Sequence, residues 1–122
     1  MMQKTILTVD DSRAMRDMLR HSLMAAGFKV LQADDGLHGL ELLETEMPDV
    51  IVTDINMPRM DGFGFIEAVR AHESRRAVPV LVLTTEVDID KKQRAKEAGA
   101  TGWIVKPFDP ARLVEAIRRV SS

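Results

Sequence analysis

Short runs of β-branched and apolar residues alternate five times with segments of helical periodicity, and this alternation constrains the fold more than any other feature. A strand–helix order repeated with short connections requires right-handed crossovers, which place helices on both faces of a parallel sheet. We therefore predict an α/β fold with a doubly wound, five-stranded parallel sheet. The expected strands span residues 6–9, 29–33, 49–54, 80–83 and 103–105.

Length and composition predict one cytoplasmic domain covering residues 1–122. The chain enters a strand at once, which leaves no place for a signal peptide, and no apolar run approaches the roughly 20 residues that span a bilayer. Cysteine is absent, so disulfides and thiolate metal sites are excluded. A net charge of −2 gives no electrostatic basis for binding nucleic acid.

The expected helices carry start and stop signals of their own. Ser12 can cap the first helix, Gly27 can end it, and the pair Asp109 and Pro110 is typical of a helix start. We expect apolar side chains at helical spacing to face the core, among them Met15, Met18, Leu19, Leu23, Leu37, Leu40, Leu43, Phe65, Ile66, Val69, Leu113, Val114, Ile117 and Val120.

The fourth helix has the thinnest apolar side of the five. It begins at Asp88 or Asp90 and ends near Gly99, and Ile89, Ala95 and Ala98 are nearly all it can bury. Because so little apolar surface holds it, we expect this helix to lie at the low end of local stability.

Polar side chains follow the strands where each one ends. Asp10 and Asp11 end the first strand, Asp54 the third, Thr84 the fourth and Lys106 the fifth. Taken alone, Asp54 fits two roles equally well: a functional carboxylate, or a residue that only caps its strand and hydrogen-bonds the following turn. Because the carboxyl ends of parallel strands share one edge, where open α/β sheets bind ligands, the joint pattern predicts a functional site.

Three crowded carboxylates repel one another and resist ionisation, and a divalent cation removes that cost. An all-oxygen site without His or Cys suits Mg²⁺. A metal ion beside a carboxylate and a lysine also suits phosphoryl transfer, since both cations neutralise the phosphoryl oxygens during in-line attack.

At these residues the chain resembles the receiver domain of two-component response regulators. The resemblance implies a flavodoxin-like sheet with strand order 2-1-3-4-5. The matching motifs run from the first strand to the fifth and are specific as an ordered set: Val9-Asp10-Asp11-Ser12, Asp54-x-x-Met57-Pro58-x-Met60-Asp61-Gly62, Leu83-Thr84 and Lys106-Pro107-Phe108.

The resemblance also implies roles. Asp54 is the phosphoacceptor, taking a phosphoryl group from a histidine kinase, and belongs with the acidic residues to the Mg²⁺ site. Asp11 ligates Mg²⁺ directly, Asp10 does so directly or through water, and Asn56 contributes its backbone carbonyl.

Thr84 bonds the phosphoryl oxygen, and Lys106 pairs with the phosphoryl group across a cis bond to Pro107. Trp103 occupies the aromatic switch position, which turns inward as Thr84 is drawn to the phosphoryl group. The family usually has Tyr or Phe there, and a packing role for the bulkier indole stays open.

Asn56 and Glu86 match positions that flank the phosphoryl group and influence its hydrolysis. Both are polar and can orient an attacking water, so we expect short-lived phosphorylation. Thr85 stands where Ala is more common, beside the phosphoryl entry, and we expect it to slow transfer slightly.

The chain ends at Ser122 without an effector domain, which predicts output through a protein contact. In its last third it most resembles stand-alone chemotaxis regulators of the CheY type. That resemblance implies a CheA-like histidine kinase as phosphodonor and the flagellar motor switch as target. We expect a monomer that signals through helix four, strand five and helix five.

Two alternatives remain at this point. The first is a phosphate sink or phosphorelay intermediate without motor output. The second is a haloacid-dehalogenase-like phosphatase, which resembles Asp-x-Asp at its nucleophile. Here Asn56 replaces the second acid, and no cap domain is present. We therefore expect self-phosphorylation and dephosphorylation without turnover of a separate substrate.

The remaining motifs predict nothing further. We expect no metal or catalytic role for His21, His38 or His72, which we place on three helices without a carboxylate four residues away. Gly36-x-x-Gly39 lacks the rest of a dinucleotide fingerprint, and no P-loop is present.

Overall fold

The computed structural model describes residues 3–121. Within them, five parallel strands form one sheet in the order β2-β1-β3-β4-β5, which confirms the predicted α/β fold and the flavodoxin-like topology. Strand β3 is one residue shorter at each end than the predicted 49–54. The strands are β1 (Thr5–Val9), β2 (Lys29–Ala33), β3 (Val50–Thr53), β4 (Val80–Thr84) and β5 (Gly102–Val105).

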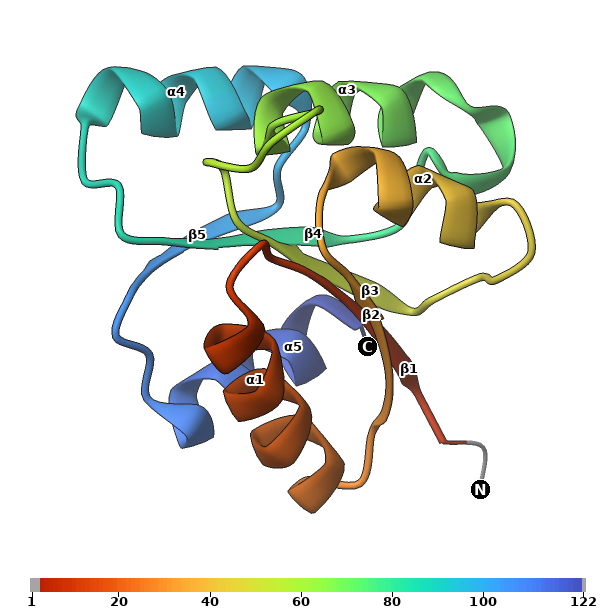
Figure 1. Ribbon diagram of the computed structural model, residues 1–122, viewed down its shortest axis with the longest axis vertical. Helices are drawn as coiled ribbons and strands as arrows, with labels where there is room; N and C mark the ends of the chain where they lie inside the picture. Colours follow the sequence, from red (N-terminus) through yellow and green to blue (C-terminus); the bar gives the residue numbers. More distant parts are fainter. Residues whose placement is uncertain (1–2, 122) are drawn as a thin grey trace.

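Helices cover both faces of the sheet (Figure 1). Helices α2, α3 and α4 lie on one face, and α1 and α5 lie on the other. The final helix was expected to reach the end of the chain, and Ser122 lies outside the described residues. The helices are α1 (Arg13–Ala25), α2 (Gly36–Leu43), α3 (Gly62–Ala71), α4 (Ile89–Ala98) and α5 (Pro110–Ser121), with a short 3₁₀ helix η1 (Glu73–Arg75) after α3.

The central strands are buried on both faces, and their side chains alternate between two apolar cores. In β3, Val50 and Val52 pack with α1 and α5, whereas Ile51 packs with α2, α3 and α4. Full burial of one such side chain stabilises the fold by about 1.5–3 kcal/mol. The run of β-branched residues in β3 therefore forms the centre of the molecule and fixes where the strand ends.

The predicted helix signals are confirmed. The Ser12 hydroxyl accepts a hydrogen bond from the Met15 amide at 3.2 Å. Gly27 and Gly99 have φ of 94° and 116° at the ends of α1 and α4, a conformation that favours glycine. The Asp109 carboxylate accepts from the Ala111 amide at 2.9 Å at the start of α5.

The prediction of a core position is wrong for three residues. Met18, Leu37 and Ile89 are 53%, 37% and 78% exposed. Leu19 occupies the inward direction of α1, and Met18 lies about 100° around the helix from it. In α2, Gly39 faces the core: a Cβ there would meet the Phe65 ring at 2.8 Å. This close approach turns Leu37 outward. Ile89 is the first residue of α4 and precedes its contact with the core.

Polar contacts hold α4 where apolar contacts are few. Within its described residues, Ala95 is the one that is fully buried. The Arg70 guanidinium donates from Nε and Nη2 to the Gly99 carbonyl at 3.0 and 2.9 Å, at the end of α4. The Arg94 guanidinium lies 4.1 Å from the centroid of the Phe63 ring. The thin apolar side is confirmed, and two arginines add to its attachment.

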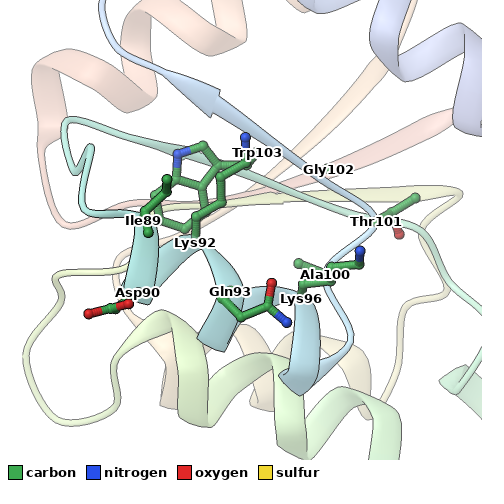
Figure 2. A pocket seen from close by; sticks show the side chains of 9 residues that line it. All are labelled: Ile89, Asp90, Lys92, Gln93, Lys96, Ala100, Thr101, Gly102 and Trp103. Atoms are coloured by element: carbon green, nitrogen blue, oxygen red, sulfur yellow. The ribbon is translucent and has the colours of Figure 1, made fainter.

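A groove of roughly 550 Å³ separates the exposed side of α4 from β5 (Figure 2). Trp103 is half-buried at one wall, where it packs against the core on the α2–α3–α4 face. Lys92 and Lys96 line the groove from α4. Among the described helices, none is long and apolar enough to cross a membrane.

Candidate functional site

Backbone hydrogen bonds bring the predicted acidic residues and lysine to one edge of the sheet. The Asp10 amide donates to the Ala33 carbonyl at 3.1 Å, and the Asp54 amide donates to the Val9 carbonyl at 2.9 Å. The Lys106 amide donates to the Thr84 carbonyl at 2.8 Å. These bonds continue the ladders one residue past the strands, so each side chain leaves the sheet at the same level.

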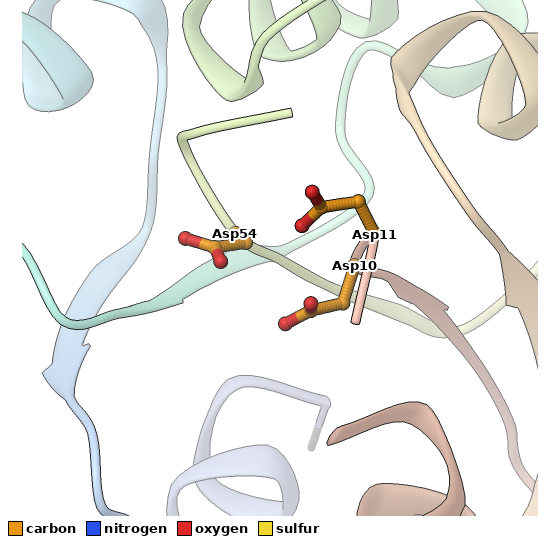
Figure 3. A group of neighbouring side chains, drawn as sticks. All are labelled: Asp10, Asp11 and Asp54. Atoms are coloured by element: carbon orange, nitrogen blue, oxygen red, sulfur yellow. The ribbon is translucent and has the colours of Figure 1, made fainter. Parts of the chain in front are cut away.

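The three carboxylates of Asp10, Asp11 and Asp54 come together at this edge (Figure 3). One oxygen of each lies within 4.8 Å of the others. Asp10 is buried, the Asp54 side chain is 11% exposed, and Asp11 is exposed. The arrangement opens to solvent on the Asp11 side.

Lys106 bridges two of these acids. Its ammonium donates to Asp10 Oδ2 at 2.8 Å and to Asp54 Oδ2 at 2.9 Å. The second oxygens are also satisfied: Asp10 Oδ1 accepts from the Ser12 amide at 2.9 Å and Asp54 Oδ1 from the Ile55 amide at 2.6 Å. The lysine therefore neutralises two charges that would otherwise repel.

Burial sets the electrostatics of the site. Burial raises the pKa of the Asp10 carboxyl above its usual range, even though the hydrogen bonds from Lys106 and Ser12 oppose the rise. Burial lowers the pKa of Lys106, but its hydrogen bonds to Asp10 and Asp54 outweigh this and leave that pKa raised. Lys106 thus stays charged at neutral pH, and burial makes the charge on Asp10 costly.

The donor set fits a magnesium ion. Within residues 3–121, Asp10, Asp11 and Asp54 form a group of acidic side chains able to converge on one cation. Their carboxylate oxygens are hard ligands, and the solvent-facing side leaves room for the waters that Mg²⁺ retains. Asp10, Asp11 and Asp54 would hold the ion.

Thr84 and Lys106 lie side by side at the ends of their strands. Thr84 is fully buried, and its hydroxyl accepts from the Glu86 amide at 3.3 Å. The bond between Lys106 and Pro107 is cis, as predicted. Asn56 is exposed in the loop after β3, two residues beyond Asp54, so its role as a carbonyl ligand stays a prediction.

Glu86 is engaged with α4. Its carboxylate accepts from Lys91 Nζ at 2.9 Å and from the Asp88 amide at 3.3 Å. The hydrogen bond from Lys91 lowers the pKa of Glu86. Thr85 is exposed beside Thr84. The structure places these two residues on the loop between β4 and α4, and their effects on phosphorylation stay predictions.

Sequence reasoning missed two arginine contacts near the site. The Arg16 guanidinium donates to the Asp10 carbonyl at 2.7 Å. Arg59, in the loop that follows Asp54, donates twice to the buried carboxylate of Asp35. Asp35 and Arg59 are 24 residues apart, and no sequence pattern links them.

The interpretation of the histidines also needs a correction. Asp34 stands four residues before His38, and the Asp34 carboxylate lies 3.1 Å from His38 Nδ1. The statement that no histidine has a carboxylate at this spacing was therefore wrong. The pair is exposed, which is typical of a surface contact of small energetic effect.

The fold and this arrangement of acids define a class of protein. The family model of the response regulator receiver domain matches residues 6–118. The chain belongs to this family, as its motifs predict.

Several of the similar proteins are chemotaxis proteins. Chemotaxis protein CheY of Pseudomonas aeruginosa is 40% identical over 116 residues, which cover 94% of each chain. The crystal structure of CheY4 of Vibrio cholerae superimposes with a TM-score of 0.93 at 44% identity, covering 98% of this chain and 99% of that one. These findings support two-component signalling of the chemotaxis type.

A third structure bears on the metal. The receiver domain of sensor histidine kinase PA1611 from P. aeruginosa has a magnesium ion coordinated in its active-site cleft. It matches with a TM-score of 0.91 at 27% identity, covering 99% of this chain and 100% of that one.

Other relatives are longer. The chain spans 45% of the probable transcriptional regulator ycf27 of Guillardia theta, at 37% identity. It spans 14% of the sensor histidine kinase CheAY of Helicobacter pylori, at 35% identity.

Proposed function

We propose that this protein is a phosphorylation switch that accepts a phosphoryl group on Asp54 from the phosphohistidine of a histidine kinase. The observation that carries the proposal is the convergence of Asp10, Asp11 and Asp54, with Lys106 bonded to two of them. The membership of CheAY, a sensor histidine kinase, among the relatives supports a kinase partner.

The proposed transfer is an in-line displacement. An Asp54 carboxylate oxygen attacks phosphorus, a P–O bond forms, and the P–N bond to the kinase histidine breaks, so the imidazole leaves. Mg²⁺, when bound, supplies charge neutralisation for the phosphoryl oxygens. Lys106 already lies 2.9 Å from Asp54 Oδ2 and adds a second positive charge without rearrangement.

We assign the metal to Asp10, Asp11, Asp54 and the backbone carbonyl of Asn56. The side-chain oxygens are already gathered, and the magnesium-bound PA1611 receiver domain supports the choice of ion. Binding would also relieve the repulsion that remains after Lys106 has neutralised part of the charge.

Thr84 and Trp103 form the proposed switch. The buried Thr84 hydroxyl now accepts from the Glu86 amide, and a phosphoryl group on Asp54 offers a charged acceptor for the hydroxyl proton. Rotation of the Thr84 side chain toward that acceptor moves its oxygen away from the Glu86 amide. Loss of that contact releases the loop that carries Glu86 into α4. Trp103, half-buried across from α4, then turns inward.

We propose that Asn56 and Glu86 tune hydrolysis, in which water attacks phosphorus and releases inorganic phosphate. Because both side chains are polar and neither is buried, each can orient that water. The label should therefore be short-lived. Acid-quenched samples taken after removal of the donor should show decay, and a label stable for many hours in Mg²⁺ would contradict this.

The proposed output surface is formed by α4, β5 and α5. It holds the groove beside Trp103, and Ile89 and Val105 expose apolar surface at 78% and 41%. The CheY relatives support a chemotaxis role, with a CheA-like kinase upstream and the flagellar motor switch as target. We place the protein in the cytoplasm as a monomer, without turnover of a separate substrate.

Intact-mass spectrometry with a small acyl phosphate and Mg²⁺ tests the proposal. The wild-type chain should gain one phosphoryl group, and chelation of the metal should prevent the gain. Asp54→Asn should gain none while keeping its fold by circular dichroism. A label that persists in Asp54→Asn would overturn the site, and turnover of a generic aryl phosphate would indicate an enzyme.

A further inference from the structure

The tip of the loop that follows Asp54 is bound to the start of α2. Arg59 Nε donates to Asp35 Oδ2 at 2.6 Å, and Arg59 Nη2 donates to Asp35 Oδ1 at 2.9 Å. Beside this fork, the Gly36 amide donates to the Met60 carbonyl at 3.2 Å. Two parallel bonds between a guanidinium and a carboxylate fix orientation as well as distance.

Asp35 is a rigid partner for this contact. The residue is 3% exposed, and Oδ1 also accepts from the His38 amide at 2.9 Å, which caps α2. Gly36 packs directly against Met60 in the loop. A Cβ at Gly36 would lie 2.7 Å from Met60 Cγ and 2.8 Å from the Met60 carbonyl oxygen, so no larger residue fits between them. The loop tip therefore docks onto a surface whose position α2 determines.

The backbone at Arg59 favours glycine, yet an arginine occupies it. Arg59 has φ of 63°, and the Met60 amide donates to the Pro58 carbonyl at 2.6 Å across it. A γ-turn with a positive central φ is the rarer, strained form. Within the described residues, Arg59 is the non-glycine position at positive φ. Such strain persists where surrounding contacts over-determine it, and here the bonds to Asp35 do so.

The base of the same loop is fixed independently. The Gly62 amide donates to the Ile55 carbonyl at 2.8 Å. A Cβ on Gly62 would overlap the Asp54 carbonyl oxygen, so α3 starts directly against the end of β3. Asn56 lies between this fixed base and the tip held by Arg59. The backbone around Asn56 is therefore constrained at both ends.

We propose that Arg59 is a positioning residue for the metal site. Its ion pair with Asp35 holds residues 55–61 in the conformation that presents the Asn56 carbonyl to Mg²⁺. This inference rests on the proposed function, because it requires that metal site. Within residues 3–121, the hydrogen bonds of the Arg59 side chain go to Asp35, which is not a proposed metal ligand, so Arg59 positions the site through the loop.

Calorimetric titration of the whole chain with MgCl₂ tests the inference. Arg59→Ala should weaken binding about tenfold, the lower end of the range for residues that orient ligands. Loss of a positive charge near three acids would by itself tighten binding, so a weaker affinity separates loop positioning from simple electrostatics. Arg20→Ala, an exposed charge-matched control on α1, should bind as the wild type does.

Four further variants separate the effect of the Arg59 side chain from that of the backbone. Arg59→Gly accepts the positive φ and so relieves the strain, yet should lose affinity as Arg59→Ala does. Asp35→Asn keeps an oxygen for the cap of α2 and should give the same loss. The double variant of Asp35→Asn with Arg59→Ala should be no weaker than either alone, and Arg59→Lys should recover part of the affinity.

The outcomes distinguish this inference from the proposed function. If the wild type binds Mg²⁺ and both Arg59→Gly and Asp35→Asn bind it equally well, the positioning role is overturned. If the wild type binds no Mg²⁺, the proposed function fails first and the inference fails with it. Since Arg59→Gly relieves strain, the test holds even where Arg59→Ala folds poorly.

Discussion

Lys106 is the residue on which the charge balance of the site depends. It is 10% exposed and lies between two carboxylates that belong to different strands, 96 and 52 residues away along the chain. Within residues 3–121, neither acid forms an ion pair with another cation. Lys106 therefore competes with a divalent cation for the same negative charge.

Replacement of Lys106 by Met should separate its two effects. Mg²⁺ should bind more tightly, because the acids are no longer neutralised, while phosphoryl transfer from a small donor should slow roughly 10²-fold, as expected on loss of one charge-stabilising donor. Calorimetry measures the Mg²⁺ affinity, and acid-quenched labelling measures the rate of phosphoryl transfer. Lys92→Met, on the exposed side of α4, is the matched control. Unchanged transfer in Lys106→Met would contradict the assigned role.

Asp35 gives a prediction about pH. The hydrogen bond from Arg59 holds the pKa of Asp35 below its usual range, although burial opposes this. Because the folded-state pKa lies below the unfolded-state value of about 4, the stabilisation is complete above that value and is lost as the pH falls through the folded-state pKa.

Asp35→Asn should therefore lower Tm most near neutral pH, and the difference from wild type should narrow below about pH 4. Thermal melts across this range measure it. A difference that stays constant or widens in acid would show that the charge of Asp35 does not stabilise the fold.

At the scale of elements, helix boundaries and most of the inward-facing positions were predictable, whereas the outward direction of a residue such as Leu37 was not. Ser12, Gly27 and Asp109 mark helix ends through local backbone chemistry, which sequence alone displays. Leu37 follows the helical period of Leu40 and Leu43 but points outward, because two glycines let α2 approach the core on a different side. Helical periodicity shows which apolar residues share one side of a helix, but it does not show which side packs against the core.

Helix α4 illustrates the same limit. Its scarcity of apolar residues was evident from the sequence, whereas its attachment through Arg70 depends on a residue of α3 meeting the end of α4. Arg70 also donates to the carbonyls of Arg76 and Val78. One side chain thereby joins α3, the connection to β4 and the C-terminus of α4.

Arg70→Ala should destabilise the fold by about 2–3 kcal/mol, since hydrogen bonds to a charged group contribute about 1.5–3 kcal/mol each and part is recovered by water. Urea unfolding measures the loss, and hydrogen exchange should locate it in α4. Arg20→Ala, at an exposed position of α1, is the control. Equal exchange rates in α4 for Arg70→Ala and wild type would refute the anchoring role.

At the scale of the whole molecule, the candidate site was predictable because a parallel sheet gathers its strand ends. Asp10, Asp11, Asp54 and Lys106 share no sequence neighbourhood beyond the first pair, yet the strand order places them together. The ion pair between Asp35 and Arg59 was not predictable, because it joins the N-cap of α2 to the tip of a loop and depends on how closely α2 approaches that loop.

The magnesium site is the central claim, and a crystal grown with saturating Mn²⁺ tests it most directly, because Mn²⁺ favours the same oxygen ligands and scatters anomalously. We predict one anomalous peak bonded to Asp11 and Asp54, with Asp10 bonded directly or through water and the Asn56 carbonyl completing the protein ligands. An anomalous map with no peak among these carboxylates, or a peak held by other side chains, would contradict the account.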